Sequence, residues 1–213
     1  QYIHVLEISS FQMQNTYSFS PKISCILNLS EDHLDIHKNF KEYANCKLNI
    51  ASNGSLLIYN SDDEKLTSII NEKKITNTLP FSKHYQKNAT YHINNNFIIN
   101  NKNKVSELDL RKVNLLGIHN FENILAALTI SKKLNLRIDA IIKALKEFQP
   151  IKHRMELVLK KNGILYINDS KATNLTASIA AIKSFKDNII LILGGLDKSN
   201  TDFSVLQKYL KSK

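Results

Sequence analysis

Residues 167–174 have the sequence Ile167-Asn168-Asp169-Ser170-Lys171-Ala172-Thr173-Asn174. An apolar, strand-like run precedes this stretch, and a helix-like pattern begins after it at Leu175. In open α/β sheets, ligands bind beyond the carboxyl ends of strands, next to helix N-termini. The stretch therefore predicts an α/β fold with a site for a phosphorylated ligand at this point. The alternative is a simple strand-to-helix turn that Thr173 or Asn174 caps.

The composition narrows the class of protein. The chain has 213 residues, of which 43% are hydrophobic, so we expect a packed core and no disorder. No apolar run approaches the roughly 18 residues that span a bilayer, so no membrane insertion is expected. Cys25 and Cys46 lack metal-type spacing. They predict buried thiols in a reducing compartment, here the cytoplasm.

The net charge is +10, which is one signature of nucleic-acid binding. The lysine pairs at 73–74, 132–133 and 160–161 are far apart in the sequence, however, and no aromatic residues alternate with them. We therefore expect a site for small anions and no nucleic-acid partner.

Apolar spacing predicts two domains with a boundary near Pro150, because proline and the residue before it interrupt a helix. Domain 1–150 is the larger, and 151–213 is the start of a second. For the first we expect strands at 2–8, 23–29 and 56–59, and helices at 39–51, 119–134 and 138–147. The polar cluster 60–63 predicts a helix cap after the strand at 56–59. Within 75–110 we expect short strands, with turns at the asparagine clusters 94–96 and 100–101. For the second we expect strands at 155–160, 163–168 and 188–193 and helices at 174–185 and 202–211. In this second domain, strands that alternate with helices indicate a parallel sheet.

Polar groups gather at the ends of the first two predicted strands. Glu7 ends the first strand, where a carboxylate binds a cation or caps the next helix. The segment 31–37 holds two histidines and three carboxylates, which either ligate a divalent ion or form a solvated acidic loop. Lys47 shares a helix face with Tyr43, and by itself it has the pattern of a solvated lysine.

Three later motifs fit a nucleotide. In 117–123 a glycine precedes a helix that begins with His119 and Asn120, and the amides of Asn120 and Asn123 suit a purine edge. A plain helix start capped by asparagine is the alternative. Arg154 offers a planar fork for phosphate or for stacking on a base. The glycine pair in 191–198 is a weak anion-binding signal.

In order and spacing, these motifs together resemble the ATP-dependent Mur ligases, which build the peptide of bacterial peptidoglycan. Residues 32–35 with Tyr43 and Lys47, and 117–123 with Ala126-Ala127, resemble motifs of the whole superfamily, which includes the folylpolyglutamate synthases. Residues 9–12, 153–154 and 168–174 resemble the branch that adds D-glutamate. The resemblance implies a central ATPase-type domain with a mostly parallel sheet, followed by a partial Rossmann-like α/β domain.

The resemblance also implies an activity. ATP converts the carboxylate of UDP-N-acetylmuramoyl-L-alanine to an acyl phosphate, and the amine of D-glutamate attacks it to form an amide. ATP and Mg²⁺ are the implied cofactors, and a monomer is expected. Another Mur or folylpolyglutamate-type ligase, or an inactive nucleotide-binding fragment, is the alternative.

The resemblance also implies roles for individual residues, according to their positions in these motifs. Glu7, His33 and Lys47, the last carbamylated, resemble metal-site and catalytic residues. Asn120, Asn123, Arg154 and Asp169 resemble ATP contacts. The remaining matches are to substrate contacts: Ser9, Gln12, Lys171, Thr173 and Lys198. The family's glycine-rich phosphate loop would precede residue 1, so we expect these 213 residues alone to be inactive.

Overall fold

The computed structural model describes residues 2–16, 18–30, 36–51, 54–185, 188–196 and 202–210. A parallel sheet has the order β1-β2-β3, from β1 (Ile23–Ile26), β2 (Leu56–Asn60) and β3 (Thr78–Phe81). The predicted α/β class is confirmed, and so is the parallel sheet that the family resemblance implies for the central domain. Expected strand 23–29 is shorter than predicted, because pairing with β2 ends at Ile26.

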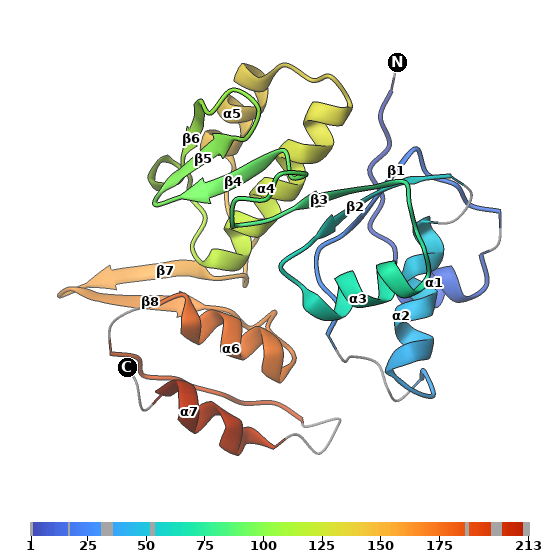
Figure 1. Cartoon of the computed structure of the whole chain (residues 1–213). Coiled ribbons are helices and arrows are strands. Elements are labelled where there is room, and N and C mark those ends of the chain that lie inside the picture. Colours follow the sequence, from blue (N-terminus) through green and yellow to red (C-terminus); the bar gives the residue numbers. More distant parts are fainter. Residues whose placement is uncertain are drawn as a thin grey trace.

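Two apolar layers cover the parallel sheet. Adjacent residues of β2 face opposite sides, so Leu57 joins one hydrophobic cluster and Ile58 the other. The Leu57 cluster is completed by α2 (Phe40–Leu48) and α3 (Glu64–Glu72). The Ile58 cluster is completed by α4 (Ile118–Lys133), with α5 (Ile138–Glu147) packed on α4. Figure 1 shows α2 and α3 on one side of the sheet and α4 on the other.

A small antiparallel sheet extends the α4 layer. It has the order β4-β5-β6, from β4 (Tyr91–Asn94), β5 (Phe97–Asn100) and β6 (Ser106–Asp109), and a 3-10 turn at Leu110–Lys112 follows. Asn95 turns the β4–β5 hairpin with φ 55°, a conformation that asparagine tolerates. The short strands and asparagine turns expected in 75–110 are thus confirmed.

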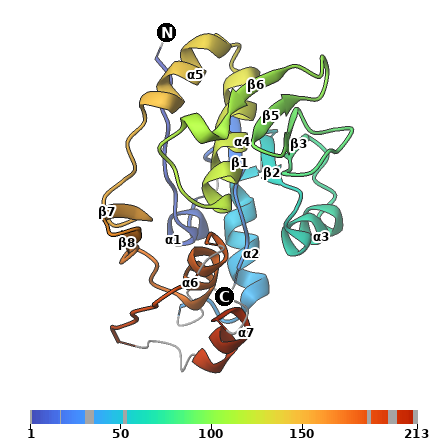
Figure 2. The same ribbon diagram turned by 90° about the vertical axis from the view of Figure 1, so that its left-hand side faces the viewer.

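The chain beyond α5 forms a second, more open group of elements. It runs down one side of the molecule to β7 (Glu156–Lys161), as Figure 2 shows. There β7 pairs antiparallel with β8 (Ile164–Asn168), and α6 (Leu175–Lys183) and α7 (Gln207–Leu210) pack together. A 3-10 turn, Phe203–Leu206, leads into α7. The parallel sheet predicted for this part is therefore wrong for β7 and β8. Asn162 and Gly163 have φ 52° and 78°, which is the geometry of a tight hairpin and explains why these two strands are antiparallel.

Two expected strands are absent from the described part of the chain. Residues 2–8 are extended but unpaired, and Tyr2 is 94% exposed. Residues 188–193 are also unpaired, and Ile190 is 94% exposed. An apolar alternating pattern forms a strand only where a neighbouring strand supplies hydrogen bonds, and no described segment does so here.

The remaining elements are short or local. Helix α1 (Ser10–Gln14) packs against α2 and against the 3-10 turn Asn49–Ala51 that follows α2. Asp63 caps α3, as the polar cluster 60–63 predicts. None of the described helices has the length and apolar character needed to cross a bilayer.

Candidate functional site

The start of α4 is shaped by Gly117, which takes φ 93° and serves as the N-cap without a side-chain hydrogen bond. Asn120 instead donates from Nδ2 to the carbonyl of Leu116 at 2.6 Å, and Asn123 donates to Asn120 Oδ1 at 3.4 Å. The alternative of a plain asparagine cap is therefore wrong. The first turn presents backbone N–H groups and two amides, a combination suited to an anionic or purine-bearing ligand.

Gly117 also permits a close contact between the two parts of the chain. A Cβ at this position would lie 2.7 Å from Ser184 Oγ, at the end of α6, and 2.6 Å from His119 Cε1. Both distances are shorter than a carbon atom tolerates. The absence of a side chain at Gly117 thus lets the end of α6 contact the start of α4.

The pKa of His119 indicates which charged residues lie near this contact. Its Nδ1 is buried and has no hydrogen-bond partner among the described residues. Burial lowers the pKa of His119 from the ordinary value of 6.5; the carboxylates of Asp169 and Glu122 oppose this, and Arg154 adds to it. The structure thereby brings Arg154 and Asp169, two sequence-predicted residues, near the start of α4, where Asn120 and Asn123 lie.

Arg154 and Asp169 belong to two segments that are bonded to each other. Asp169 accepts from the backbone N–H of Met155 at 3.0 Å, and the N–H of Lys171 donates to the carbonyl of His153 at 3.0 Å. His153 and Met155 take φ 68° and 47°, so this tight turn is held by its partners on the other segment. The motifs at 153–154 and 168–171 are therefore joined by hydrogen bonds at the end of β8.

Asn174 caps α6 by accepting from Ala177 N at 2.9 Å, as the simple-turn alternative predicts. Lys171 and Thr173 precede this cap and are exposed. A cap at Asn174 leaves the exposed Lys171 and Thr173 available for other contacts.

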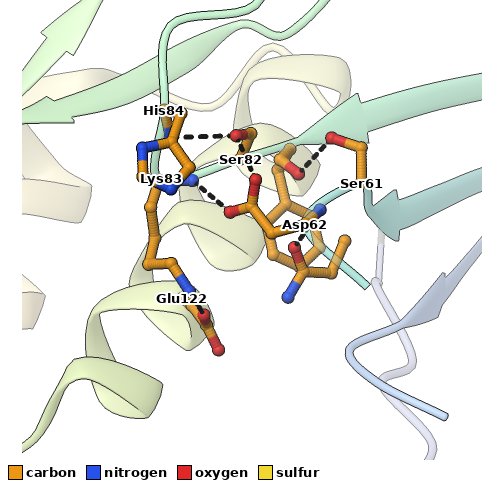
Figure 3. Close-up of polar contacts among 8 residues, drawn as sticks. Ser61, Asp62, Ser82, Lys83, His84 and Glu122 are labelled. Carbon is orange, nitrogen blue, oxygen red and sulfur yellow. Dashed lines mark hydrogen bonds and ion pairs between the residues drawn. The ribbon is translucent and has the colours of Figure 1, made fainter. Parts of the chain in front are cut away.

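Sequence reasoning missed a polar network that fixes the start of α4 from the other side. Asp62 accepts from Ser82 Oγ at 2.6 Å and from the N–H of Lys83 at 2.7 Å. The ammonium of Lys83 forms an ion pair with Glu122 on α4. Figure 3 shows Lys83 reaching from the end of β3 to Glu122. The signal for this network in the sequence was the run of polar residues after β2. We interpreted that run as a helix cap alone.

A second group of predicted residues lies around α1. Ser9 caps α1, and its hydroxyl and backbone N–H form a capping box with Gln12. The helix cap is thus Ser9, and the alternative of Glu7 as a cap is wrong. Glu7 is exposed in the extended segment before this cap. Ser9 and Gln12 have a local structural role here, and their substrate role stays a prediction.

His37 connects α1 with α2. It is fully buried, its Nε2 lies 3.0 Å from Ser10 Oγ, and its ring stacks on Phe11 at 5.5 Å between centroids. Its ring also meets Tyr43 at 5.5 Å, and Lys47 Nζ lies 4.9 Å from the centre of that tyrosine ring. This confirms the predicted shared face of Tyr43 and Lys47. A continuous row of contacts therefore runs from α1 to Lys47.

The remaining predicted residues have no structural test. His33 and Lys198 lie outside the described residues, as do most of the acidic segment 31–37 and part of the glycine-pair motif. Among the described residues, no three His, Cys, Asp or Glu side chains converge as a metal site would require. Neither Glu7 nor Lys47 forms an ion pair with another described residue.

Comparison with known proteins supplies the family. Residues 2–131 match the Mur ligase middle domain. The UDP-N-acetylmuramoylalanine–D-glutamate ligase of Thermoanaerobacter sp. (strain X514) is 40% identical over 92% of the chain and 44% of its own length. The ligase of that name from Listeria monocytogenes is 35% identical over 100% of the chain and 46% of its own length. The chain thus spans about half the length of the curated relatives it matches.

Solved structures agree on the fold. A UDP-N-acetylmuramoyl-L-alanyl-D-glutamate–2,6-diaminopimelate ligase superposes with a TM-score of 0.63 and 22% identity, over 83% of this chain and 38% of that one. A MurF ligase from Thermotoga maritima in complex with ADP superposes with a TM-score of 0.60 and 17% identity, over 83% and 42%. With the matched domain covering more than half of its residues, the chain belongs to the Mur ligase family.

Proposed function

We propose that this chain is part of an ATP-dependent ligase that joins D-glutamate to UDP-N-acetylmuramoyl-L-alanine and releases ADP. The relatives with 35–40% identity carry that name, and residues 168–174 keep the motif of the D-glutamate-adding branch. The observation that carries the proposal is the approach of Arg154 and Asp169 to the first turn of α4. Arg154 and Asp169 are distant from α4 in the sequence yet lie close enough to influence the charge of His119, which supports a nucleotide site between two domains.

The proposed division of labour follows from this arrangement. Asn120 and Asn123 recognise the adenine, while Arg154 binds phosphate or stacks on the base and Asp169 accepts from the ribose hydroxyls. Lys171, Thr173 and Lys198 bind the D-glutamate carboxylates, and Ser9 and Gln12 line the uridine-linked substrate. We place the domain boundary near Pro150, so that closure of 151–213 on 1–150 brings the acyl phosphate and the amine together.

The residues present fit Mg²⁺ by their chemistry. Glu7 and a carbamylated Lys47 supply oxygen atoms, which Mg²⁺ prefers, and His33 would complete the set. Neither Glu7 nor Lys47 is committed to another described ion pair, and the Ser10–His37–Tyr43 contacts fix α1 against the helix that carries Lys47. When bound, the metal offsets charge on the transferred phosphoryl group.

Carbamylation of Lys47 has a direct readout. Addition of ¹³C-labelled bicarbonate should give a carbamate carbon signal that disappears in the Lys47→Arg variant, because the guanidinium does not form this adduct. A signal that persists in that variant would place the adduct elsewhere.

The activity is tested by ADP release from the complete protein, with UDP-N-acetylmuramoyl-L-alanine and D-glutamate, L-glutamate, L-lysine or meso-diaminopimelate as the amino acid. We expect turnover only with D-glutamate, and in the Asp169→Ala variant a loss of kcat/KM of roughly 10–100-fold. Turnover with another amino acid would retain the ligase chemistry and overturn the assigned substrate. We further propose that the protein is a cytoplasmic monomer with no nucleic-acid partner.

A further inference from the structure

A cavity lies at the opposite end of α4 from the candidate nucleotide site. It has a volume of about 680 Å³, and its walls come from the loop before β4, the turn after β5 and the end of α4. This volume falls within the range of ligand sites, about 300–1,000 Å³. Because α4 has 16 residues, the two ends of the helix are about 24 Å apart. The cavity is therefore separate from the residues assigned to ATP.

The lining of this cavity carries one sign of charge. Four lysines, Lys87, Lys102, Lys132 and Lys133, line it, and none of the described lining residues is acidic. None of the four forms an ion pair with a described carboxylate, and the Nζ of Lys132 lies 6.0 Å from the centre of the Tyr91 ring. A hollow lined by charges of one sign concentrates the field and attracts counter-ions.

A carboxylate lies behind the cavity wall and contacts one of the lining residues. Glu107 accepts from the Nδ2 of Asn100, a lining residue, at 3.0 Å. Glu107 does not line the cavity itself. Its single charge therefore leaves the four ammonium groups with a clear positive excess.

The backbone that carries two of these lysines is held in place. Asn101 donates from Nδ2 to the carbonyls of Gln86 and Ala89 at 3.0 and 2.8 Å, on either side of Lys87. The N–H of Lys102 donates to Asn100 Oδ1 at 3.0 Å. The exposed Tyr85 ring lines the same cavity and packs edge-on against His92, with centroids 5.4 Å apart. Lysines on a held backbone beside an exposed aromatic face suit a phosphate-bearing ligand with a flat ring.

We propose that this lysine cavity is a second ligand site, which binds a small phosphate-bearing anion of nucleotide size. Nothing in the proposed ligase reaction uses these residues. A nucleic acid is a poorer match, because it needs a continuous basic surface, and the other lysine pairs of the chain are scattered. The end of α4 adds a weak negative potential that helps to hold Lys132 and Lys133 there when no ligand is bound.

Titration calorimetry with inorganic tripolyphosphate at about 0.15 M ionic strength tests the site without the ligase reaction. The test variant replaces the four cavity lysines with glutamine. The control variant replaces Lys73, Lys74, Lys160 and Lys161, which are exposed and outside the cavity. Each variant removes four positive charges from a chain of net charge +10, so general attraction of anions falls equally in both.

We expect the cavity variant to lose about tenfold or more in affinity, while the control changes by about twofold or less. ADP should bind the cavity more tightly than pyrophosphate does, and this advantage should vanish in Tyr85→Ala. Equal losses in both variants, or no binding by the unmodified chain, would overturn the proposal. Tighter binding of a single-stranded oligonucleotide than of tripolyphosphate, with the same lysine dependence, would also overturn it in favour of a nucleic-acid site.

Discussion

The central part of the molecule, up to α5, and the part from 151 to 210 both contain apolar strands and helices. The two parts differ in how deeply the apolar side chains of these elements are buried. In the central part Ile58 and Leu125 are fully buried between the sheet and α4. In the second part Leu159 is 47% exposed and Ile192 is 89% exposed. An apolar pattern therefore identifies which side chains can enter a core, while burial depends on whether neighbouring elements cover them.

The largest expected contrast comes from the same substitution in both parts. Leu125→Ala should reduce the free energy of unfolding by about 2–5 kcal/mol, because it leaves a cavity in a packed core. Leu165→Ala in β8 should cost only about 1 kcal/mol, because Leu165 is 44% exposed. Urea unfolding followed by far-UV circular dichroism measures both. Equal losses would mean that the second part is as well packed as the first.

The contact between the two parts is tested at Gly117. Gly117→Ala should cost about 1–3 kcal/mol more than Gly163→Ala, since a Cβ at 117 meets Ser184 and His119 whereas a Cβ at 163 meets nothing. Both glycines have positive φ, so each variant carries a backbone penalty as well. Urea unfolding of the two variants measures the difference in stability. A smaller loss of stability for Gly117→Ala would show that the end of α6 does not contact the start of α4 closely.

Removal of a helix cap should give a smaller difference in stability between the two parts. Asp63 accepts from Leu66 N at 2.9 Å and from Leu29 N at 2.7 Å, so it joins α3 to the chain after β1. Asp63→Ala should cost about 2 kcal/mol, and Asn174→Ala, at the exposed cap of α6, about 0.5–1 kcal/mol. Asp63→Asn should recover the Leu66 bond and only part of the stability. Thermal melts rank the three variants, and a larger loss for Asn174→Ala would contradict the assignment.

The smallest expected effect is a pH dependence from His119. Because burial lowers the pKa of His119 in the folded chain, the unfolded chain binds the proton first as the pH falls below 6.5. The contribution to the free energy of unfolding is zero above this pH. It becomes increasingly unfavourable below 6.5, until the folded-state pKa is passed. His119→Gln should remove this part of the slope. An unchanged slope would mean that His119 is as solvated in the fold as in the unfolded chain.

Much of the central part was predictable from sequence, because its elements carry their own signals. The spacing of apolar residues predicted α4 and α5 closely, and the polar cluster 60–63 predicted the cap of α3. The asparagine run at 94–96 predicted the β4–β5 turn. In each case the deciding interaction lies within a few residues of the signal.

The rest could not be predicted because it depends on partners distant in sequence. Residues 2–8 and 188–193 have strand patterns but no strand beside them. The Asn162-Gly163 turn sets β7 and β8 antiparallel, a signal that the strand–helix alternation concealed. At the candidate site the motifs were visible, but Lys83–Glu122 joins positions 39 residues apart. Sequence spacing alone does not reveal such a pair.

The central claim is that one nucleotide site uses the start of α4 and the turn that follows β8. Hydrogen–deuterium exchange of the complete protein, with and without Mg-ADP, tests it most directly. We predict that exchange slows together at residues 117–124, 153–155 and 168–171, with the same dependence on ADP concentration. Protection of 117–124 alone would contradict the claim, because Arg154 and Asp169 would then lie near α4 without contacting the nucleotide.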